Sequence, residues 1–433
     1  MWNFPNEEDT AIYKAGMYSP TSIIGVRLLV HYSTRDTPYI VNKDKIISSN
    51  LSILSQATNT NAFGIGAAFI DTLDINVALD APGVKGATKG VTQFTLEAGY
   101  GTTKDNIKYV PIGIYRMQDR SCSRKNGYYT LKLQSFMAAL DKNVPSNIKV
   151  SGTVKDIISY LCSKVYIRNV SDNTKDIKLY LSSKMTDSYI ASLPNSNISF
   201  TINKDTGYTT YRDILKDIAV ISCSFATFDN EGGLLLVPFQ NHTYVTSEGI
   251  VDSIPQDQII SFAENIDNFN VEEIRCILED DNGDKVDYGY PIDADKDYNI
   301  DISSTRILKT LESKDVANQI SASIYERIGN ENGYSPRPFE IKTRNPDFRL
   351  RVGDWVEATD ILKDDSGAYI KSAAQIMKIS YSVPGSCTYS SFTNPTNNDN
   401  NATYRSSYTP TGSSKGGSGT TVVDQTGQWH FNT

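Results

Sequence analysis

Alternating apolar and polar residues dominate the first third of the chain and predict β-strands there. Residues 23–32 form a mainly apolar run, and apolar residues alternate with polar ones around 73–79, 94–98 and 129–133. A period of two is typical of strands that bury one face. Glycine-containing stretches at 81–83, 99–101 and 125–127 separate these segments and predict turns. Many short strands joined by polar turns indicate an antiparallel barrel or sandwich.

Helical periodicity appears in the middle of the chain, in two segments that share one pattern. Residues 153–164 and 210–222 each begin with threonine, carry aspartate three positions later and continue with apolar residues on one face. The threonine can cap the helix, and the aspartate then lies near the positive end of the helix dipole. The shared pattern is open to two interpretations, an internal repeat or two unrelated helices with ordinary caps. After the second helix, residues 225–239 predict a hairpin with its turn at 230–233.

An amphipathic helix is predicted at 314–328, because apolar residues recur there every four positions. Ser313 can cap its start, and Gly329 stands where a left-handed C-cap residue belongs. Alternating runs at 339–343, 354–358 and 375–381 follow the helix and predict strands. Residues 257–290 are expected to open the barrel that these strands complete.

Three stretches resemble phage tail hub proteins, the ring proteins that join a tail tube to its tip or spike in contractile phages, prophages and phage-tail-like bacteriocins. The helix at 314–328, the segment Asn345-Pro-Asp-Phe-Arg-Leu-Arg-Val-Gly-Asp-Trp-Val-Glu and the strand at 376–383 resemble the last barrel of that family. Residues 109–117, followed by 128–140, resemble its first barrel. Tyr211-Arg-Asp-Ile-Leu and the hairpin with Gly232-Gly-Leu match its middle region. The resemblance covers about residues 23–392.

The resemblance implies a mainly β fold with α+β insertions, in which two antiparallel β-barrel domains of the tail-tube type flank smaller α/β domains. We place an N-terminal arm without a core of its own at 1–20, the first barrel at 21–145, the insertions at 146–257 and the second barrel at 258–392. Residues 393–433 are rich in Ser, Thr, Asn and Gly and predict a flexible tail. Its aromatic end is open to two interpretations, a docking peptide or a disordered terminus.

The same resemblance implies a structural protein and no enzymatic activity. In that family three copies form a ring. With two similar barrels in each subunit, the ring has approximate sixfold symmetry, which matches the tail tube, and threefold symmetry, which matches the tip. The expected partners are a homotrimer, the tail tube protein, and the tip or spike with other baseplate proteins. DNA is expected to pass the channel without specific binding, and the expected location is the virion tail, after synthesis in the host bacterial cytoplasm. The alternative is the hub-fold N-terminal module of a tail-associated cell-wall lysin in a non-contractile tail.

Charge and hydropathy argue against two classes of partner, nucleic acids and membranes. The chain has 433 residues, with 42 Lys and Arg against 50 Asp and Glu, and no basic stripe that would bind a phosphate backbone. No window approaches 18 uninterrupted apolar residues, so no membrane-spanning segment is expected. Acidic residues concentrate between 257 and 301. They are interpreted either as a solvated surface or as the lining of a channel that repels DNA.

No catalytic residue, cofactor site or metal site is expected. Histidine occurs only at 31, 242 and 430, and none stands in a nucleophile elbow. Cys223 and His242 are a conceivable peptidase pair, but Cys223 ends an apolar helix face and is expected to be a buried structural residue. The five cysteines are scattered, which predicts reduced thiols.

Acidic residues alternate along 293–301 in a way that resembles a calcium loop. Tyr298 replaces the glycine that an EF-hand loop needs, and Ser304 replaces its bidentate glutamate. An EF-hand is therefore excluded, and only weak cation binding by these carboxylates stays open.

Overall fold

The computed structural model describes most of the chain. The described residues are 2–32, 35–56, 65–84, 91–125, 127–168, 177–239, 250–264, 271–280, 282–291, 299–311, 313, 315–329, 339–363, 369–383, 386–391, 396–397, 422–423 and 429–430. The predicted flexible tail at 393–433 lies outside them, except for three pairs of residues in the short strands β25 (Thr396–Asn397), β26 (Val422–Val423) and β27 (Trp429–His430).

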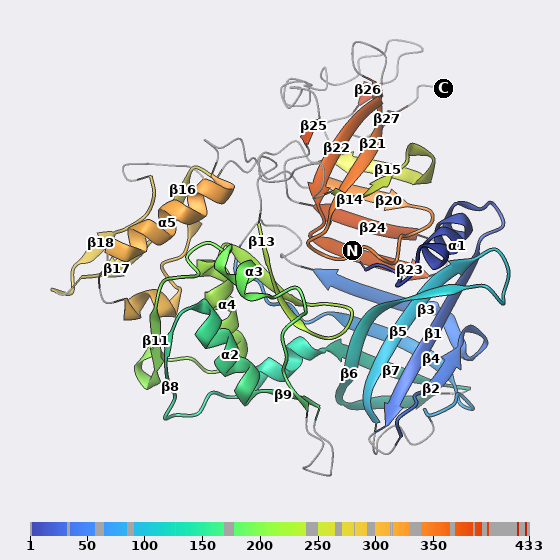
Figure 1. Cartoon of the computed structure of the whole chain (residues 1–433), viewed down its shortest axis with the longest axis horizontal. Coiled ribbons are helices and arrows are strands. Elements are labelled where there is room, and N and C mark those ends of the chain that lie inside the picture. Colours follow the sequence, from blue (N-terminus) through green and yellow to red (C-terminus); the bar gives the residue numbers. More distant parts are fainter. Residues whose placement is uncertain are drawn as a thin grey trace.

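One antiparallel sheet of 11 strands forms the frame of the molecule, in the order β15-β20-β24-β23-β3-β4-β7-β6-β5-β1-β2. The first seven in the chain are β1 (Ile23–Tyr32), β2 (Tyr39–Asn42), β3 (Ile46–Gln56), β4 (Thr72–Ala78), β5 (Val91–Gly101), β6 (Lys108–Lys125) and β7 (Tyr128–Ser135). The others are β15 (Ile259–Glu264), β20 (Phe339–Thr343), β23 (Lys378–Val383) and β24 (Ser386–Ser391). The sheet curls into a nearly closed, barrel-like shape (Figure 1), and the predicted mainly β fold is confirmed.

Strand β3 connects the two segments predicted as barrels. Its first residues pair with β4, and residues 51–56 pair with β23. Residues 52–54 pair with both neighbours, and the register with β4 shifts between Ile47 and Ser52. A shift of this kind bends a strand and lets it change direction. The strands of 21–145 and 258–392 are therefore joined in one continuous ladder.

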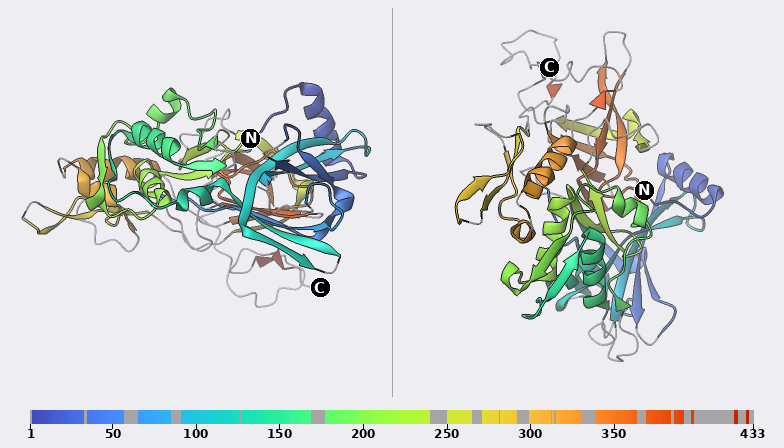
Figure 2. Two further views of the ribbon diagram at one scale, coloured as in Figure 1. Left: turned by 90° about the horizontal axis from the view of Figure 1, so that it is seen from below. Right: turned by 60° about the vertical axis from the view of Figure 1, so that its left-hand side comes forward.

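The inserted region holds small sheets and short helices beside the first barrel segment, on the side away from helix α1 (Glu7–Tyr18) (Figures 1 and 2). Its helices are α2 (Val154–Lys164), α3 (Asp187–Ala191) and α4 (Tyr211–Ile221). Its strands are β8 (Lys149–Gly152), β9 (Tyr166–Arg168), β10 (Ile177–Lys178), β11 (Phe200–Asn203), β12 (Ser224–Phe228) and β13 (Leu234–Pro238). Strand β14 (Ile250–Ile254) lies within the bounds predicted for the insertions but pairs with β21 (Trp355–Lys363) of the second barrel segment. The predicted helices at 153–164 and 210–222 and the hairpin at 225–239 are confirmed.

The predicted capping arrangement is present at both helices. At α4 the Thr210 Oγ1 accepts from the Asp213 backbone N at 3.2 Å, and Asp213 Oδ2 accepts from the Thr210 backbone N at 3.2 Å. At α2 the Asp156 carboxylate accepts from the Thr153 backbone N at 2.9 Å. These contacts satisfy backbone donors that a helix start otherwise leaves without an intrahelical partner.

Replacing Thr210 by alanine should lower the free energy of unfolding by about 1 kcal/mol, the usual cost of losing a threonine N-cap. The exposed Thr103 lies in a turn, so Thr103→Ala is the matched control and should change stability by less than about 0.5 kcal/mol. Urea denaturation followed by circular dichroism measures both. Equal midpoints for the two variants would contradict a stabilising cap at α4.

Residues 271–328 lie apart from the 11-stranded sheet. Strand β16 (Glu273–Arg275) pairs in parallel with β19 (Asn299–Asp301), and β17 (Ile277–Glu279) forms a hairpin with β18 (Lys285–Asp287). The predicted helix is confirmed as α5 (Asp315–Ile328), and Ser313 Oγ accepts from the Asp315 backbone N at 3.3 Å. Of the stretch expected to open the second barrel, only β15 enters the large sheet, because the three-residue strands pair locally with one another.

The first 20 residues contain helix α1 (Glu7–Tyr18), which the sequence pattern does not predict. It lies against β5, and Tyr13, Gly16 and Met17 are buried. A Cβ atom on Gly16 would lie 2.7 Å from the backbone N of Gly101, so the helix approaches this strand closely only because glycine stands there. The predicted turn at 99–101 is wrong, since these residues end β5 and serve this close packing.

Candidate functional site: the junction loop

The segment that resembles the hub family is an irregular, buried loop. We call residues 345–354 the junction loop; it connects β20 to β21 (Trp355–Lys363), which pairs with β22 (Tyr369–Gln375) and with β14. Gly353 has φ +96°, and a Cβ atom there would lie 2.6 Å from Val237 Cγ1. The glycine of the motif is thus required both by its backbone conformation and by close packing on the inserted hairpin.

Asp347 and Arg349 form a buried ion pair inside the junction loop. Arg349 Nε donates to Asp347 Oδ1 at 2.9 Å, and the Arg349 backbone N donates to the same oxygen at 3.0 Å. The two side chains are only 7 % and 2 % exposed, respectively. Burial removes both charges from water, so neither is tolerated here without the other.

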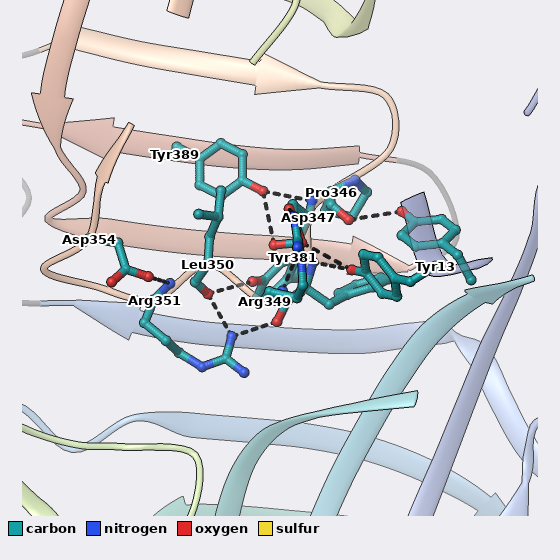
Figure 3. Close-up of polar contacts among 11 residues, drawn as sticks. Tyr13, Pro346, Asp347, Arg349, Leu350, Arg351, Asp354, Tyr381 and Tyr389 are labelled. Carbon is teal, nitrogen blue, oxygen red and sulfur yellow. Dashed lines mark hydrogen bonds and ion pairs between the residues drawn. The ribbon is translucent and has the colours of Figure 1, made fainter. Parts of the chain in front are cut away.

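Three tyrosine hydroxyls, from helix α1 and strands β5 and β24, complete this network (Figure 3). Tyr13 of α1 donates to Asp347 Oδ1 at 3.1 Å and accepts from the Phe348 backbone N at 2.8 Å. Tyr389 of β24 accepts from the Asp347 backbone N at 3.1 Å. Tyr100 of β5 donates to the backbone O of residue 346 at 2.9 Å.

The tyrosines of this network are strongly held in their protonated form. Burial, and after it the charge of the Asp347 carboxylate, raises the pKa of Tyr13 and of Tyr100 well above the usual range. Both hydroxyls therefore stay neutral hydrogen-bond donors at neutral pH.

The N-terminal residues bind the same loop. The backbone N of Trp2 donates to Arg349 O at 3.0 Å, and Asn345 Nδ2 donates to Met17 O at 2.9 Å. The Arg349 guanidinium carbon also lies 5.3 Å from the centre of the Tyr13 ring. Helix α1 is therefore fixed to the second barrel segment as well as to β5.

Arg351 extends the contacts of the loop to the first barrel segment and the insertion. Its Nη1 donates to Phe348 O at 2.7 Å, its Nη2 donates to the backbone O of Pro111 in β6, and its Nε donates to Asn230 Oδ1 in the hairpin turn. Asp354 Oδ2 accepts from the Arg351 backbone N at 2.8 Å. The junction loop thus binds helix α1, both barrel segments and the inserted hairpin at once.

Of the candidate catalytic residues of the sequence, Cys223 and His31 are described, and both lie outside the junction loop. Cys223 is fully buried, as predicted, and burial raises the pKa of its thiol to about 12, which makes it a poor nucleophile. His31 lies in β1 as predicted, with Nε2 3.1 Å from Thr95 Oγ1. His242 lies outside the described residues. Cys162, Cys223, Cys276 and Cys387 are all free thiols.

The described residues contain neither a cluster of metal-ligating side chains nor a membrane-spanning helix. Across the described ranges, no group of three or more His, Cys, Asp or Glu side chains could hold a metal ion. In the same part of the chain, no helix combines the length and the apolar character needed to cross a membrane. Most of the alternating acidic segment at 293–301 lies outside the described residues, so weak cation binding there stays a prediction.

The patterns in the sequence did not identify the tyrosines of the junction. Tyr13 and Asp347 are 334 positions apart, and Tyr100 lies 246 positions from Pro346. No periodicity or spacing links residues so distant in the chain. The only available signal was the Asp347-x-Arg349 spacing itself, in a segment otherwise rich in apolar residues.

Comparison with known proteins gives structural similarities only, since no protein-family model and no curated protein matches the chain. The tail protein from Neisseria meningitidis MC58 is 12 % identical, with 85 % of this chain and 96 % of that chain covered and a TM-score of 0.45. The 43 kDa tail protein of prophage MuSo2 from Shewanella oneidensis is 13 % identical, with 85 % and 98 % covered and a TM-score of 0.45. A chain of the lidded Francisella PdpA-VgrG complex is 13 % identical, with 85 % and 52 % covered and a TM-score of 0.45.

Proposed function

We propose that this protein is a structural baseplate or tail-tip hub protein of a phage or a phage-tail-like particle. Three copies form a ring that joins the sixfold tail tube to the threefold tip or spike and surrounds the channel. The observation that carries the proposal is the junction loop. It belongs to one of the sequence stretches that resemble hub proteins, and it binds helix α1, both barrel segments and the inserted hairpin to one another.

A ring subunit of this kind has to hold its two barrel segments in one fixed arrangement, because both contribute to the symmetry of the ring. The buried Asp347 and Arg349 pair and the tyrosine hydroxyls around it supply such a constraint. Fully matched polar networks in a protein interior rigidify a fold and select one arrangement. The continuous ladder through β3 and β23 connects the same two segments a second time.

The remaining features of the proposal follow from the ring. Its partners are two further copies, the tail tube protein, and the tip or spike with other baseplate proteins. A single subunit cannot close a ring, so interfaces of at least standard size between copies are expected. In this proposal part of the acidic charge between 257 and 301 lines the channel and keeps DNA from binding. The protein then resides in the particle tail, after synthesis in the bacterial cytoplasm, and has no enzymatic activity.

Oligomeric mass tests the proposal directly. Light scattering at several concentrations should give about three times the monomer mass of 47.9 kDa, and negative-stain images of the same sample should show rings with a central hole. Purified tube protein is added in a parallel series, because ring closure can depend on the tube. A monomer in both series would contradict the hub proposal, and cell-wall hydrolysis by the same sample would favour the lysin alternative.

A further inference from the structure

A cavity of about 230 Å³ lies where β6, the inserted hairpin and the junction loop meet. Its walls carry branched aliphatic side chains from every one of these parts and from β23. They include Ile112, Ile114, Leu235, Val237, Val352 and Ile379. None of these six side chains takes part in the polar contacts of the junction loop, but Arg351 and Asp354, which do, also line the cavity, so the cavity adjoins the network.

Most of the polar residues that line the cavity already have hydrogen bonds within the protein. Arg351 binds backbone carbonyls and Asn230, as described above. Asp229 Oδ1 accepts from the backbone N of Gly233 at 2.8 Å, and the Tyr189 hydroxyl donates to Leu236 O at 2.7 Å. A charged guest would have to compete with these contacts, whereas an apolar guest would meet the aliphatic walls without disturbing them.

We propose that this cavity is a binding site for a compact, neutral aromatic ring of up to about the size of indole. An engineered apolar cavity of about 150 Å³ holds benzene, so 230 Å³ accommodates a fused bicyclic ring. Dispersion contacts with closely packed aliphatic side chains would hold such a ring. Its position between separate segments of the chain is typical of small-molecule sites.

The aromatic ring that occupies the cavity can come from two sources, a free small molecule or an aromatic side chain of another protein. A side chain brings its backbone with it to the cavity, whose lining includes the exposed Lys184. Indole and N-acetyltryptophanamide therefore serve as paired probes, because they carry the same ring and differ in the attached backbone.

Isothermal calorimetry and ligand-observed NMR on the full chain test the site. Indole is expected to bind once per chain, with a dissociation constant on the order of 0.1–1 mM, as for a ligand of about nine heavy atoms. Equal or tighter binding of N-acetyltryptophanamide would identify a side chain as the natural guest, and binding of indole alone would identify a free molecule. Saturable binding of neither probe would overturn the proposal.

A matched pair of substitutions locates the binding. Val237→Phe fills the cavity and should weaken indole binding at least tenfold, whereas Val286→Phe places the same change on the exposed strand β18 and should leave binding unchanged. Val237 packs beside Gly353, so Ile114→Phe, in a half-buried part of the wall, is the second filling variant. Circular dichroism confirms that each variant is folded.

The filling variants also separate this proposal from the hub proposal. If folded Val237→Phe or Ile114→Phe protein binds indole as tightly as the unmodified chain, the cavity is not the site. Ring formation measured on the same variants reports on the hub proposal alone, because binding of the probes does not require a trimer.

Discussion

Replacing Arg349 by methionine should lower the free energy of unfolding by about 3–5 kcal/mol, the range expected when one partner of a buried ion pair is removed. The substitution leaves the Asp347 carboxylate 7 % exposed and without its cation. Methionine has a similar length, so the loss is chiefly electrostatic. Urea denaturation followed by tryptophan fluorescence and by circular dichroism measures the change, and agreement of the two probes establishes that one transition is observed.

Arg35→Met is the matched control for this prediction. Arg35 is exposed and lies over the Tyr39 ring, with its guanidinium carbon 4.0 Å from the ring centre, so its loss should cost no more than about 1 kcal/mol. The double variant Asp347→Asn with Arg349→Met removes both charges of the pair. It should be more stable than Arg349→Met alone, because no unmatched charge is left in the interior. Similar losses at Arg349 and Arg35 would contradict the role given to the ion pair.

Local patterns in the sequence were sufficient to predict α2, α4, α5 and several of the strands. The period of two predicted the strands of the first barrel segment, and the recurrence of apolar residues every four positions predicted α5. The caps of α2 and α4 were predicted as well, because the residues that form them are only three positions apart. Each of these features depends on interactions within one turn or one hairpin, which a single sequence records directly.

Contacts between distant segments could not be predicted in the same way. Nothing in residues 51–56 indicates that they pair with β23, more than 300 positions away. The pattern also does not distinguish strands that pair locally, such as β17 and β18, from strands that enter a large sheet. Strand pairing over long separations is determined by the whole fold, so the location of the junction became visible only in three dimensions.

Glycine was the most ambiguous local signal. Gly99 and Gly101 predict a turn by composition, yet they lie in β5. A Cβ atom on Gly99 would lie 1.9 Å from the carbonyl oxygen of Lys108, and Gly101 lies against Gly16 of α1. Glycine serves turns and close backbone approach equally well, and only the neighbouring segments decide between the two. Of these two glycines, Gly101 permits the close approach of α1, and Gly99 permits that of β6.

Replacing Tyr13 by alanine should lower the free energy of unfolding by about 3–5 kcal/mol, as for other fully buried aromatic residues. The Tyr13 side chain is 0 % exposed, packs on Tyr100 with ring centres 5.3 Å apart and donates to Asp347. Tyr18 in the same helix is 41 % exposed, so Tyr18→Ala is the matched control and should cost less than about 1 kcal/mol. Thermal and urea unfolding of both variants measure the difference.

The comparison decides whether α1 is an arm or a part of the junction. If α1 were an arm that did not pack on the rest of the chain, Tyr13→Ala and Tyr18→Ala would lower the free energy of unfolding by nearly the same amount. If the helix belongs to the junction, Tyr13→Phe, which removes only the hydroxyl, should already cost about 1–3 kcal/mol, because Asp347 loses a buried donor. Its effect should also depend on Arg349. In a double-mutant cycle of Tyr13→Phe and Arg349→Met, a coupling energy of at least about 0.5 kcal/mol is expected for side chains that share one carboxylate, and strict additivity would place them in separate networks.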